Sequence, residues 1–318
     1  MSKIDLSIII ISYNTKQITH DCFESIFKYT TGIKFETIVV DNGSKDGSLE
    51  MLRNFSKKQP ELILVDAKEN LGFGRGNNLG AKRARGEYLL FLNSDTLIFD
   101  NALKEAVEIV KKRLKFGAYS CRLLNFDKSF QPSGGYFPNF WNLIAWQFFL
   151  DDLPVIGKRI KSIHPHEQGF FFLDSLRKKK EGEVISVSDE HHEWVTGAFM
   201  IVPKKLFDLV GGFDKKIFMY TEEMELCYRL AKIGYPTFYT DDPAIIHIGG
   251  ASGSSSLALT MEILNMIYFW KKHKPYWQLP LVKFAFLFGS LLRLLIFGII
   301  KGDEKARKAY FHALKFIL

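Results

Sequence analysis

Strand-like and helix-like segments alternate through the first 95 residues, and this alternation limits the choice of folds more than any other feature. Short apolar runs are typical of buried strands, and helical spacing of apolar residues covers the stretches between them. Strands are predicted at residues 6–11, 36–40, 62–65 and 88–92, and helices at 17–29, 49–55 and 77–84. Such alternation is typical of a mostly parallel sheet with helices on both faces. The sequence therefore predicts an α/β fold.

Three of these strands end in polar residues, namely Ser12-Tyr13-Asn14, Asp41-Asn42 and Asn93-Ser94-Asp95. In open α/β sheets, ligands bind at the carboxyl ends of the strands, so the three ends are expected along one edge. A carboxylate such as Asp95 at the end of a buried strand can hold Mg²⁺ or Mn²⁺. The alternatives are that Asp95 only caps the following turn, and that Asp41 only forms a turn with Gly43.

A glycine-rich segment, residues 70–80, follows the third strand. It matches neither the Rossmann G-x-G-x-x-G pattern nor the P-loop pattern. Glycines let backbone amides approach a phosphate or a base, and the start of a helix favours anions. A flexible turn is the alternative interpretation of this segment.

Acidic residues open a helix predicted at 222–233, where Thr221 is the expected N-cap and Glu222, Glu223 and Glu225 follow. Acids in a first turn stabilise a helix through its dipole. A hydrophobic run precedes them, and an acid pressed against aromatic side chains has a raised pKa and can act as a general base. His247, in a last strand predicted at 244–248, is either a core histidine or, with Asp95, a ligand of Mn²⁺.

Three further features of the sequence concern its insertion, its cysteines and its N-terminal apolar run. Residues 125–193 are predicted to be an insertion or a lid on the acceptor side, with many Phe and Trp and a basic run at 177–180, and a strand pattern returns at 194–202. The three cysteines are widely spaced, which argues against a zinc site and indicates a reducing compartment. The apolar run after residue 5 is too short for a signal peptide and is interpreted as the first strand.

The C-terminal stretch carries most of the positive charge. Residues 251–318 contain ten Lys and Arg and three acids, a net charge of +7, which leaves +1 for residues 1–250. The basicity is therefore no argument for nucleic-acid binding by the main domain. Residues 279–300 are apolar and long enough to cross a bilayer, but Arg293 would cost about 2.5–3.5 kcal/mol near its centre. Helices lying in the membrane surface are therefore preferred, and a soluble helical hairpin packed on the domain or on a second subunit is the alternative.

Taken together, these segments resemble the family-2 inverting glycosyltransferases of the glycosyltransferase-A fold, and most of all the bacterial rhamnosyltransferase-like branch. The resemblance covers residues 5–252. The matching stretches, the last being the most specific, are 7–14, 39–44, 70–80, 91–95, Gln131-Pro132-Ser133-Gly134-Gly135, and 194–252. It implies a catalytic domain at 1–252, with a Rossmann-like nucleotide-binding half, and a basic helical tail at 253–318.

The resemblance also implies roles for single residues. Asn93-Ser94-Asp95 takes the place of the family's Asp-x-Asp motif, with Asp95 and His247 as the metal ligands for Mn²⁺ or Mg²⁺. Glu223 takes the position of the catalytic base, and Glu222 and Glu225 remain alternatives. The nucleotide-sugar site is implied at Ser12, Tyr13, Asn14, Asp41, Asn70, Gly72, Phe73, Asn77, Asn93, Ser94, Trp194 and Gly197.

Two departures from the family pattern are visible. Asn93 replaces the first Asp of the motif, so the metal gains one charged ligand fewer, and Glu223 stands where the family usually has Asp.

The implied function is metal-dependent, inverting transfer of a sugar, from dTDP-rhamnose or a UDP-hexose, to a glycan acceptor. A lipid-linked acceptor and a place on the cytoplasmic face of the inner membrane are expected, and a homo-oligomer is possible. The alternatives are an inactive scaffold of a membrane polysaccharide-assembly complex, favoured by the two departures, and, ranked lower, a nucleotidyltransferase.

Overall fold

The structure is a computed structural model that describes residues 3–153, 157–164, 192–249 and 255–317. The chain forms two units. The first comprises residues 1–134, 186–218 and 222–252, and the second comprises residues 135–185, 219–221 and 253–318. Each unit is described by itself.

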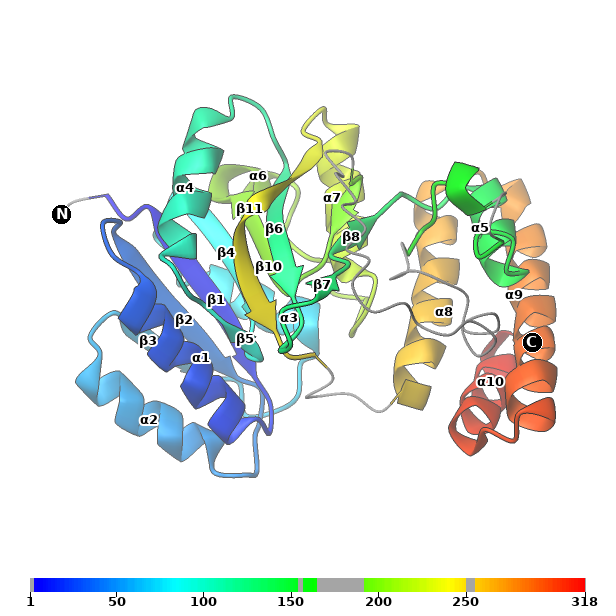
Figure 1. Ribbon diagram of the computed structural model, residues 1–318, viewed down its shortest axis with the longest axis horizontal. Coiled ribbons are helices and arrows are strands. Elements are labelled where there is room, and N and C mark those ends of the chain that lie inside the picture. Colours follow the sequence, from blue (N-terminus) through cyan, green and yellow to red (C-terminus); the bar gives the residue numbers. More distant parts are fainter. Residues whose placement is uncertain (1–2, 154–156, 165–191, 250–254, 318) are drawn as a thin grey trace. The chain divides into compact units, whose positions relative to one another are not determined.

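One large sheet forms the centre of the first unit (Figure 1). Among the described residues its strands lie in the order β3-β2-β1-β4-β10-β6-β11-β5, and β7 pairs with β6. The pairs β3–β2, β2–β1, β1–β4 and β6–β11 are parallel, whereas β10 is antiparallel to both of its neighbours. The strands are β1 (Leu6–Ser12), β2 (Phe35–Asp41), β3 (Leu62–Asp66), β4 (Tyr88–Asn93), β5 (Thr96–Leu97), β6 (Ala118–Leu124), β7 (Phe130–Gln131), β10 (Phe199–Pro203) and β11 (Thr237–His247).

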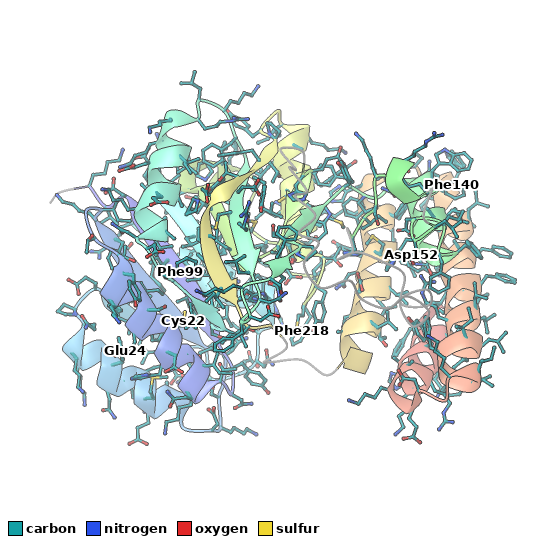
Figure 2. All side chains as sticks on the ribbon, in the orientation of Figure 1. Cys22, Glu24, Phe99, Phe140, Asp152 and Phe218 are labelled. Atoms are coloured by element: carbon teal, nitrogen blue, oxygen red, sulfur yellow. The ribbon has the colours of Figure 1, made fainter. Side chains whose placement is uncertain are left out.

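Helices cover one face of this sheet because alternate residues of the buried strands point to it. Ile8 and Ile10 of β1 and Leu90 of β4 belong to a core with the apolar sides of three helices. These helices are α1 (Lys16–Tyr29), α2 (Ser48–Lys58) and α4 (Ala102–Lys112). Cys22 of α1, labelled in Figure 2, lies in this core, and burial raises the pKa of its thiol to about 12. All three cysteines are free and buried.

The opposite face carries α3 (Phe73–Ala81), α6 (Lys204–Leu209) and α7 (Glu222–Lys232). A side chain at Gly80 would clash with Ile9, its ideal Cβ lying 2.6 Å from Cγ2 of that residue, so α3 packs unusually close to the sheet. Phe91 of β4 contacts Phe207 and Phe213 on the same face. Helices on both faces confirm the predicted α/β architecture.

Several elements differ from the sequence prediction. Helix α3 begins at Phe73 instead of residue 77, so the glycine-rich segment is largely helical, not a flexible turn. The 194–202 pattern divides into β9 (Trp194–Val195) and β10, and β11 begins at Thr237, seven residues before the predicted start. The helix and strand α4 and β6, at residues 102–124, were not predicted. The basic run at 177–180 and residues 250–252 lie outside the described residues.

The second unit is helical where the structure describes it. It contains α5 (Phe140–Gln147), α8 (Ser255–His273), α9 (Leu279–Arg293), a π-helical turn at Leu294–Ile300 and α10 (Glu304–Ile317). Short 3₁₀ turns lie at Gly157–Arg159 and Tyr276–Gln278. Among the described residues, one helix, Tyr276–Ile300, is long and apolar enough to cross a membrane by length and composition.

Arg293 of α9 is turned into this unit. Its guanidinium donates to the carbonyls of Trp146 and Gln147 and lies 4.2 Å from the ring centre of Phe149. These carbonyls belong to the last turn of α5, where the helix dipole favours a cation. The charge that argues against a membrane location in the sequence is therefore satisfied inside the protein.

Candidate active site

The carboxyl ends of the first, second and fourth strands lie side by side, as predicted. Ser12 of β1 pairs with Asp41 of β2, and Ile11 of β1 pairs with Asn93 of β4. Parallel pairing in this register brings the polar residues after each strand to one edge of the sheet.

Asn93, Asp95 and His247 form a polar cluster at this edge. Nε2 of His247 lies 3.3 Å from Oδ1 of Asp95 and 3.2 Å from Nδ2 of Asn93. On the other side of the ring, Nδ1 lies 2.7 Å from Oε1 of Gln131. An amide oxygen only accepts, so in the neutral ring Nδ1 carries the proton and Nε2 has the lone pair. Gln131 appears among the motif residues of the sequence, but no role was predicted for it.

The chemistry of this cluster fits a divalent cation. A neutral imidazole nitrogen and a carboxylate oxygen are ligands that Mn²⁺ accepts, and a second hydrogen bond that orients the histidine is typical of metal sites. Within the described part of the chain, no group of three or more His, Cys, Asp and Glu side chains is placed to hold a metal. Among the described residues, the cluster therefore brings together one carboxylate and one imidazole that suit a cation.

Asp41 is fully buried, and its two oxygens differ. Oδ2 accepts from the backbone amides of Gly43 and Ser44, at 3.2 and 3.1 Å, which is the turn that the sequence offered as the alternative. Oδ1 is also buried and has no hydrogen-bond partner. An unsatisfied buried acceptor costs about 1–3 kcal/mol, so this oxygen is a candidate for a donor that the protein itself does not supply.

The glycine-rich segment is fixed by amide side chains. Asn42 donates to Oδ1 of Asn70 and to the carbonyl of Gly72, and it accepts from the amide of Leu71. Gly72 has φ of 76°, and a side chain there would meet the carbonyl of Phe218 at 2.0 Å. Asn77 is buried and donates to the carbonyl of Phe73 within α3. These glycines serve close packing, and the role of Asn42 was not predicted.

Other predicted residues have structural partners. The Ser12 hydroxyl is buried and lies 3.3 Å from that of Thr19. Asn14 has φ of 54° and accepts from the amide of Lys45, which ties the end of β1 to the 43–46 turn. Tyr13 and Ser94 are half-buried.

Two further predicted residues lie at β9 and just after it. Trp194 is buried in β9, which pairs with β8 (Gly134–Gly135) in a separate two-stranded sheet. Gly197 lies against the ring of Phe73, so a side chain at residue 197 would clash with that ring.

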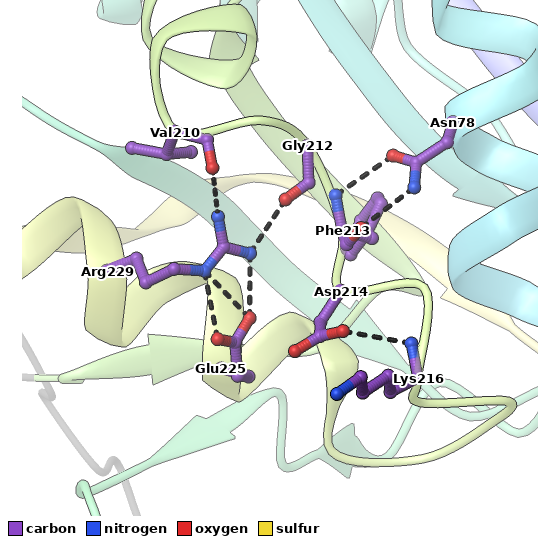
Figure 3. A network of polar contacts seen from close by, with 8 residues as sticks. All are labelled: Asn78, Val210, Gly212, Phe213, Asp214, Lys216, Glu225 and Arg229. Carbon is purple, nitrogen blue, oxygen red and sulfur yellow. Dashed lines mark hydrogen bonds and ion pairs between the residues drawn. The ribbon is translucent and has the colours of Figure 1, made fainter. Parts of the chain in front are cut away.

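The three acids of α7 have different environments. Glu225 is fully buried and paired with Arg229, which also donates to the carbonyls of Val210 and Gly212 (Figure 3). Glu222 is 2% exposed, and burial together with the charge of Glu223 raises its pKa well above that of an ordinary glutamate. Glu223 is half-buried.

The turn before these acids is strained. Tyr220 and Thr221 have φ of 67° and 81°, a conformation that is rare for a β-branched residue. Thr221 therefore does not have the extended backbone of an ordinary N-cap. Strain of this kind costs about 1–3 kcal/mol per residue and clusters at functional sites.

The model of the family described as glycosyl transferase family 2 matches residues 7–171 of the chain. The chain belongs to glycosyl transferase family 2. Glycosyltransferase YfnE of Bacillus subtilis, which is uncharacterized, is 38% identical over 34% of this chain and 26% of its own length. The chain thus spans about a quarter of that relative.

Two relatives are matched over most of their length. Rhamnosyltransferase WbbL of Escherichia coli is 24% identical over 66% of this chain and 81% of its own length. The N-acetylglucosaminyl-diphospho-decaprenol L-rhamnosyltransferase of Mycobacterium tuberculosis is 22% identical over 77% of each chain.

A solved structure shows the same fold. The structure of mannosyltransferase PcManGT from Pyrobaculum calidifontis, in complex with GDP-Man and Mn²⁺, matches 99% of this chain and 87% of its own chain, with a TM-score of 0.58 and 16% identity. The architecture is that expected for the glycosyltransferase-A fold.

Proposed function

We propose that this family-2 transferase moves a sugar from a nucleotide-sugar to a glycan, with inversion and with the help of Mn²⁺ or Mg²⁺, in bacterial surface polysaccharide synthesis. The observation that supports it most strongly is the cluster of Asn93, Asp95 and His247, in which a carboxylate and an imidazole lone pair meet at the end of β4. Asp95 and His247 would hold the metal ion. When bound, that ion would supply positive charge to the leaving diphosphate.

Asp41 is proposed to bind the nucleobase. Its unpartnered Oδ1 suits an N–H donor, such as N3–H of uracil or thymine. Because Asp41 has no exposed surface, base binding requires a small shift of the neighbouring turn. Asn70, Gly72, Phe73 and Asn77 would line the same pocket, with Ser12 to Asn14, Asn93, Ser94, Trp194 and Gly197 as further lining residues.

Glu223 is proposed as the general base. An acceptor hydroxyl has a pKa far above 7, so a carboxylate must take its proton as the oxygen attacks. Glu223 is half-buried and can be reached, whereas Glu222 is enclosed and Glu225 is occupied by Arg229. The negative charge of Glu223 contributes, after burial, to the raised pKa of Glu222. Attack opposite the diphosphate inverts the anomeric carbon.

The donor sugar is proposed to be rhamnose from dTDP-rhamnose, with UDP-hexoses as the second choice. The support is that two relatives matched over most of their length are named rhamnosyltransferases. The name of the M. tuberculosis relative also includes a diphospho-decaprenol, which supports a lipid-linked acceptor.

A membrane surface is proposed as the partner of α9. Five large apolar side chains at heptad-like spacing are each at least 43% exposed along α9 and the π-helical turn that follows it, namely Leu281, Phe284, Phe288, Leu291 and Leu295. Tyr276 and Trp277, 73% and 68% exposed, lie at its start, where aromatic residues favour the lipid headgroups.

The charges around α9 suit an anionic leaflet. Exposed Lys271 and Lys272 precede it, and Lys301, Lys305 and Lys308 follow it. With Arg293 turned inward, Lys283 is the one exposed charge of α9, and its long side chain can reach the lipid headgroups. A helix that lies in the cytoplasmic surface of the inner membrane fits these features.

The test is a calorimetric panel of dTDP-, UDP- and GDP-sugars with and without Mn²⁺, on the wild-type protein and on Asp95→Ala. We expect one donor to bind in a metal-dependent way, and this binding to be lost in Asp95→Ala but kept in a Glu108→Gln control, at an exposed position of α4. No binding of any donor would favour the scaffold alternative. NMR of the product anomer then tests inversion.

A further inference from the structure

A directed chain of hydrogen bonds runs from the hairpin between β6 and β7 to His247. We infer that Asp127, Ser129, Asn125 and Gln131 are positioning residues that fix the tautomer of His247, so that its Nε2 lone pair always faces Asp95. The value of this tautomer for metal binding rests on the proposed function, but the tautomer itself does not.

The chain begins at a carboxylate, which at neutral pH has no proton to give. The Ser129 hydroxyl donates to Oδ1 of Asp127 at 2.5 Å. Having used its only proton, this hydroxyl oxygen must act as the acceptor for Nδ2 of Asn125, at 2.9 Å. The orientation of the Asn125 amide is thereby set, with its oxygen pointing away from Ser129.

The orientation of the Asn125 amide sets the orientation of the Gln131 amide, which in turn contacts His247. Oδ1 of Asn125 accepts from Nε2 of Gln131 at 3.0 Å, so the Gln131 amide turns its oxygen to the other side. That oxygen, Oε1, lies 2.7 Å from Nδ1 of His247 and can only accept. Nδ1 must therefore carry the ring proton, which leaves Nε2 as the acceptor for Asn93.

The backbone holds these side chains at a fixed distance from one another. Gln131 pairs with Leu123 across the β6–β7 ladder, and the amide of Asn125 donates to the carbonyl of Ser129 at 2.9 Å. His247 is the last residue of β11, which is parallel to β6. The hairpin and the histidine are therefore carried by neighbouring strands of one sheet.

The tautomer matters because the wrong one would place an N–H where a cation should bind. Partners of metal-binding histidines typically change metal affinity by 10–100-fold when they are removed. The same arrangement also brings an imidazole lone pair next to a carboxylate, which is unfavourable without a donor or cation between them.

The first test is NMR of the His247 ring in metal-free protein, at a pH where the ring is neutral. We expect the Nδ1–H tautomer in the wild type, a mixture in Gln131→Met, and recovery of Nδ1–H in Gln131→Glu, because a carboxylate still accepts from Nδ1. The same tautomer in the wild type and in Gln131→Met would overturn the inference, as would the Nε2–H form in the wild type.

The second test measures Mn²⁺ affinity of the same folded variants by electron paramagnetic resonance. Binding should weaken 10–100-fold in Gln131→Met and be close to wild type in Gln131→Glu. Equal affinity in all three would overturn the role of the chain in metal binding. Failure of the wild type to bind Mn²⁺, with the tautomer still dependent on Gln131, would support the chain and overturn the metal proposal instead.

Discussion

Arg229 and Glu225 lie one turn apart on α7, and two nitrogens of Arg229 donate to the carboxylate of Glu225, Nε at 2.9 Å and Nη2 at 2.7 Å (Figure 3). The same guanidinium donates to two carbonyls of the loop that carries Phe213, and Asn78 of α3 holds the backbone of Phe213 from the other side. Arg229 therefore anchors this loop, and Glu225 holds the guanidinium of Arg229 in place.

Replacing Arg229 by Ala is expected to destabilise the protein, because it leaves a buried carboxylate without its partner. Removal of one partner of a buried pair costs about 3–5 kcal/mol. Urea unfolding of Arg229→Ala measures this loss.

Glu223→Gln is the matched comparison, since it should abolish transfer with little change in the free energy of unfolding. If Glu225→Gln removed activity at full stability while Glu223→Gln did not, the base would be Glu225.

The raised pKa of Glu222 predicts a pH dependence of stability. Between the unfolded pKa, about 4.3, and the higher folded pKa, the native state binds more protons than the unfolded state, so the stability falls as the pH rises. One group contributes at most about 1.4 kcal/mol per pH unit. Glu222→Gln should remove this slope, which unfolding curves from pH 5 to pH 8 will show. An unchanged slope would contradict the assignment.

Asp41→Asn should change base preference. The asparagine oxygen can keep the turn hydrogen bonds from Gly43 and Ser44, which leaves an N–H where Oδ1 now lies. A donor facing N3–H of uracil or thymine should weaken dTDP and UDP binding by about 10–100-fold, whereas N3 of cytosine accepts. Calorimetry with UDP and CDP checks this reversal. Loss of both nucleotides in folded protein would contradict it.

Much of the first unit is predictable from the sequence because its strands are short apolar runs that end in polar residues. Leu6–Ser12 and Tyr88–Asn93 are cases in which local pattern and burial agree. The start of α3 is different. Gly80 within the helix and Gly72 just before it are required because Ile9 and Phe218 come close to them in the fold, and no local sequence pattern shows those contacts.

The role of a polar or charged residue depends on its burial and on its partners in the fold, which the sequence does not show. Glu225 and Arg229 are four residues apart, yet the sequence left Glu225 as a candidate base because burial is not visible there. Gln131 lies 116 residues from His247, so only the folded sheet shows the contact. The inward direction of Arg293 depends in the same way on α5.

The outer stripe of α9 should govern membrane binding. Phe284→Ser with Phe288→Ser removes two exposed rings, each contributing about 1.5–3 kcal/mol when buried, so vesicle affinity should fall at least 100-fold. Flotation with vesicles of anionic phospholipid measures this. Phe126→Ser, an exposed ring of the first unit, is the control. Equal binding of all variants, or a dimer dissociated by the double substitution, would contradict the lipid assignment.

Asn265 of α8 offers a test of the strained turn. Its amide donates to the carbonyls of Met219 and Tyr220, both at 2.8 Å. Asn265→Ala should cost about 1–3 kcal/mol of stability and lower the transfer rate. Thr221→Gly, which accepts the φ of 81° without strain, should restore part of the stability. Additive effects in this double-mutant cycle would show that the two sites are independent.

The two units alternate along the sequence, which limits how this chain can be recombined with its relatives. Residues 219–221, immediately before Glu222 and Glu223, belong to the same unit as the C-terminal helices, and Asn265 of those helices holds their carbonyls. A chimaera that joins residues 1–252 to a foreign tail would inherit the turn but lose the side chain that supports it. Tail and turn should therefore be exchanged together when acceptor preferences are transplanted.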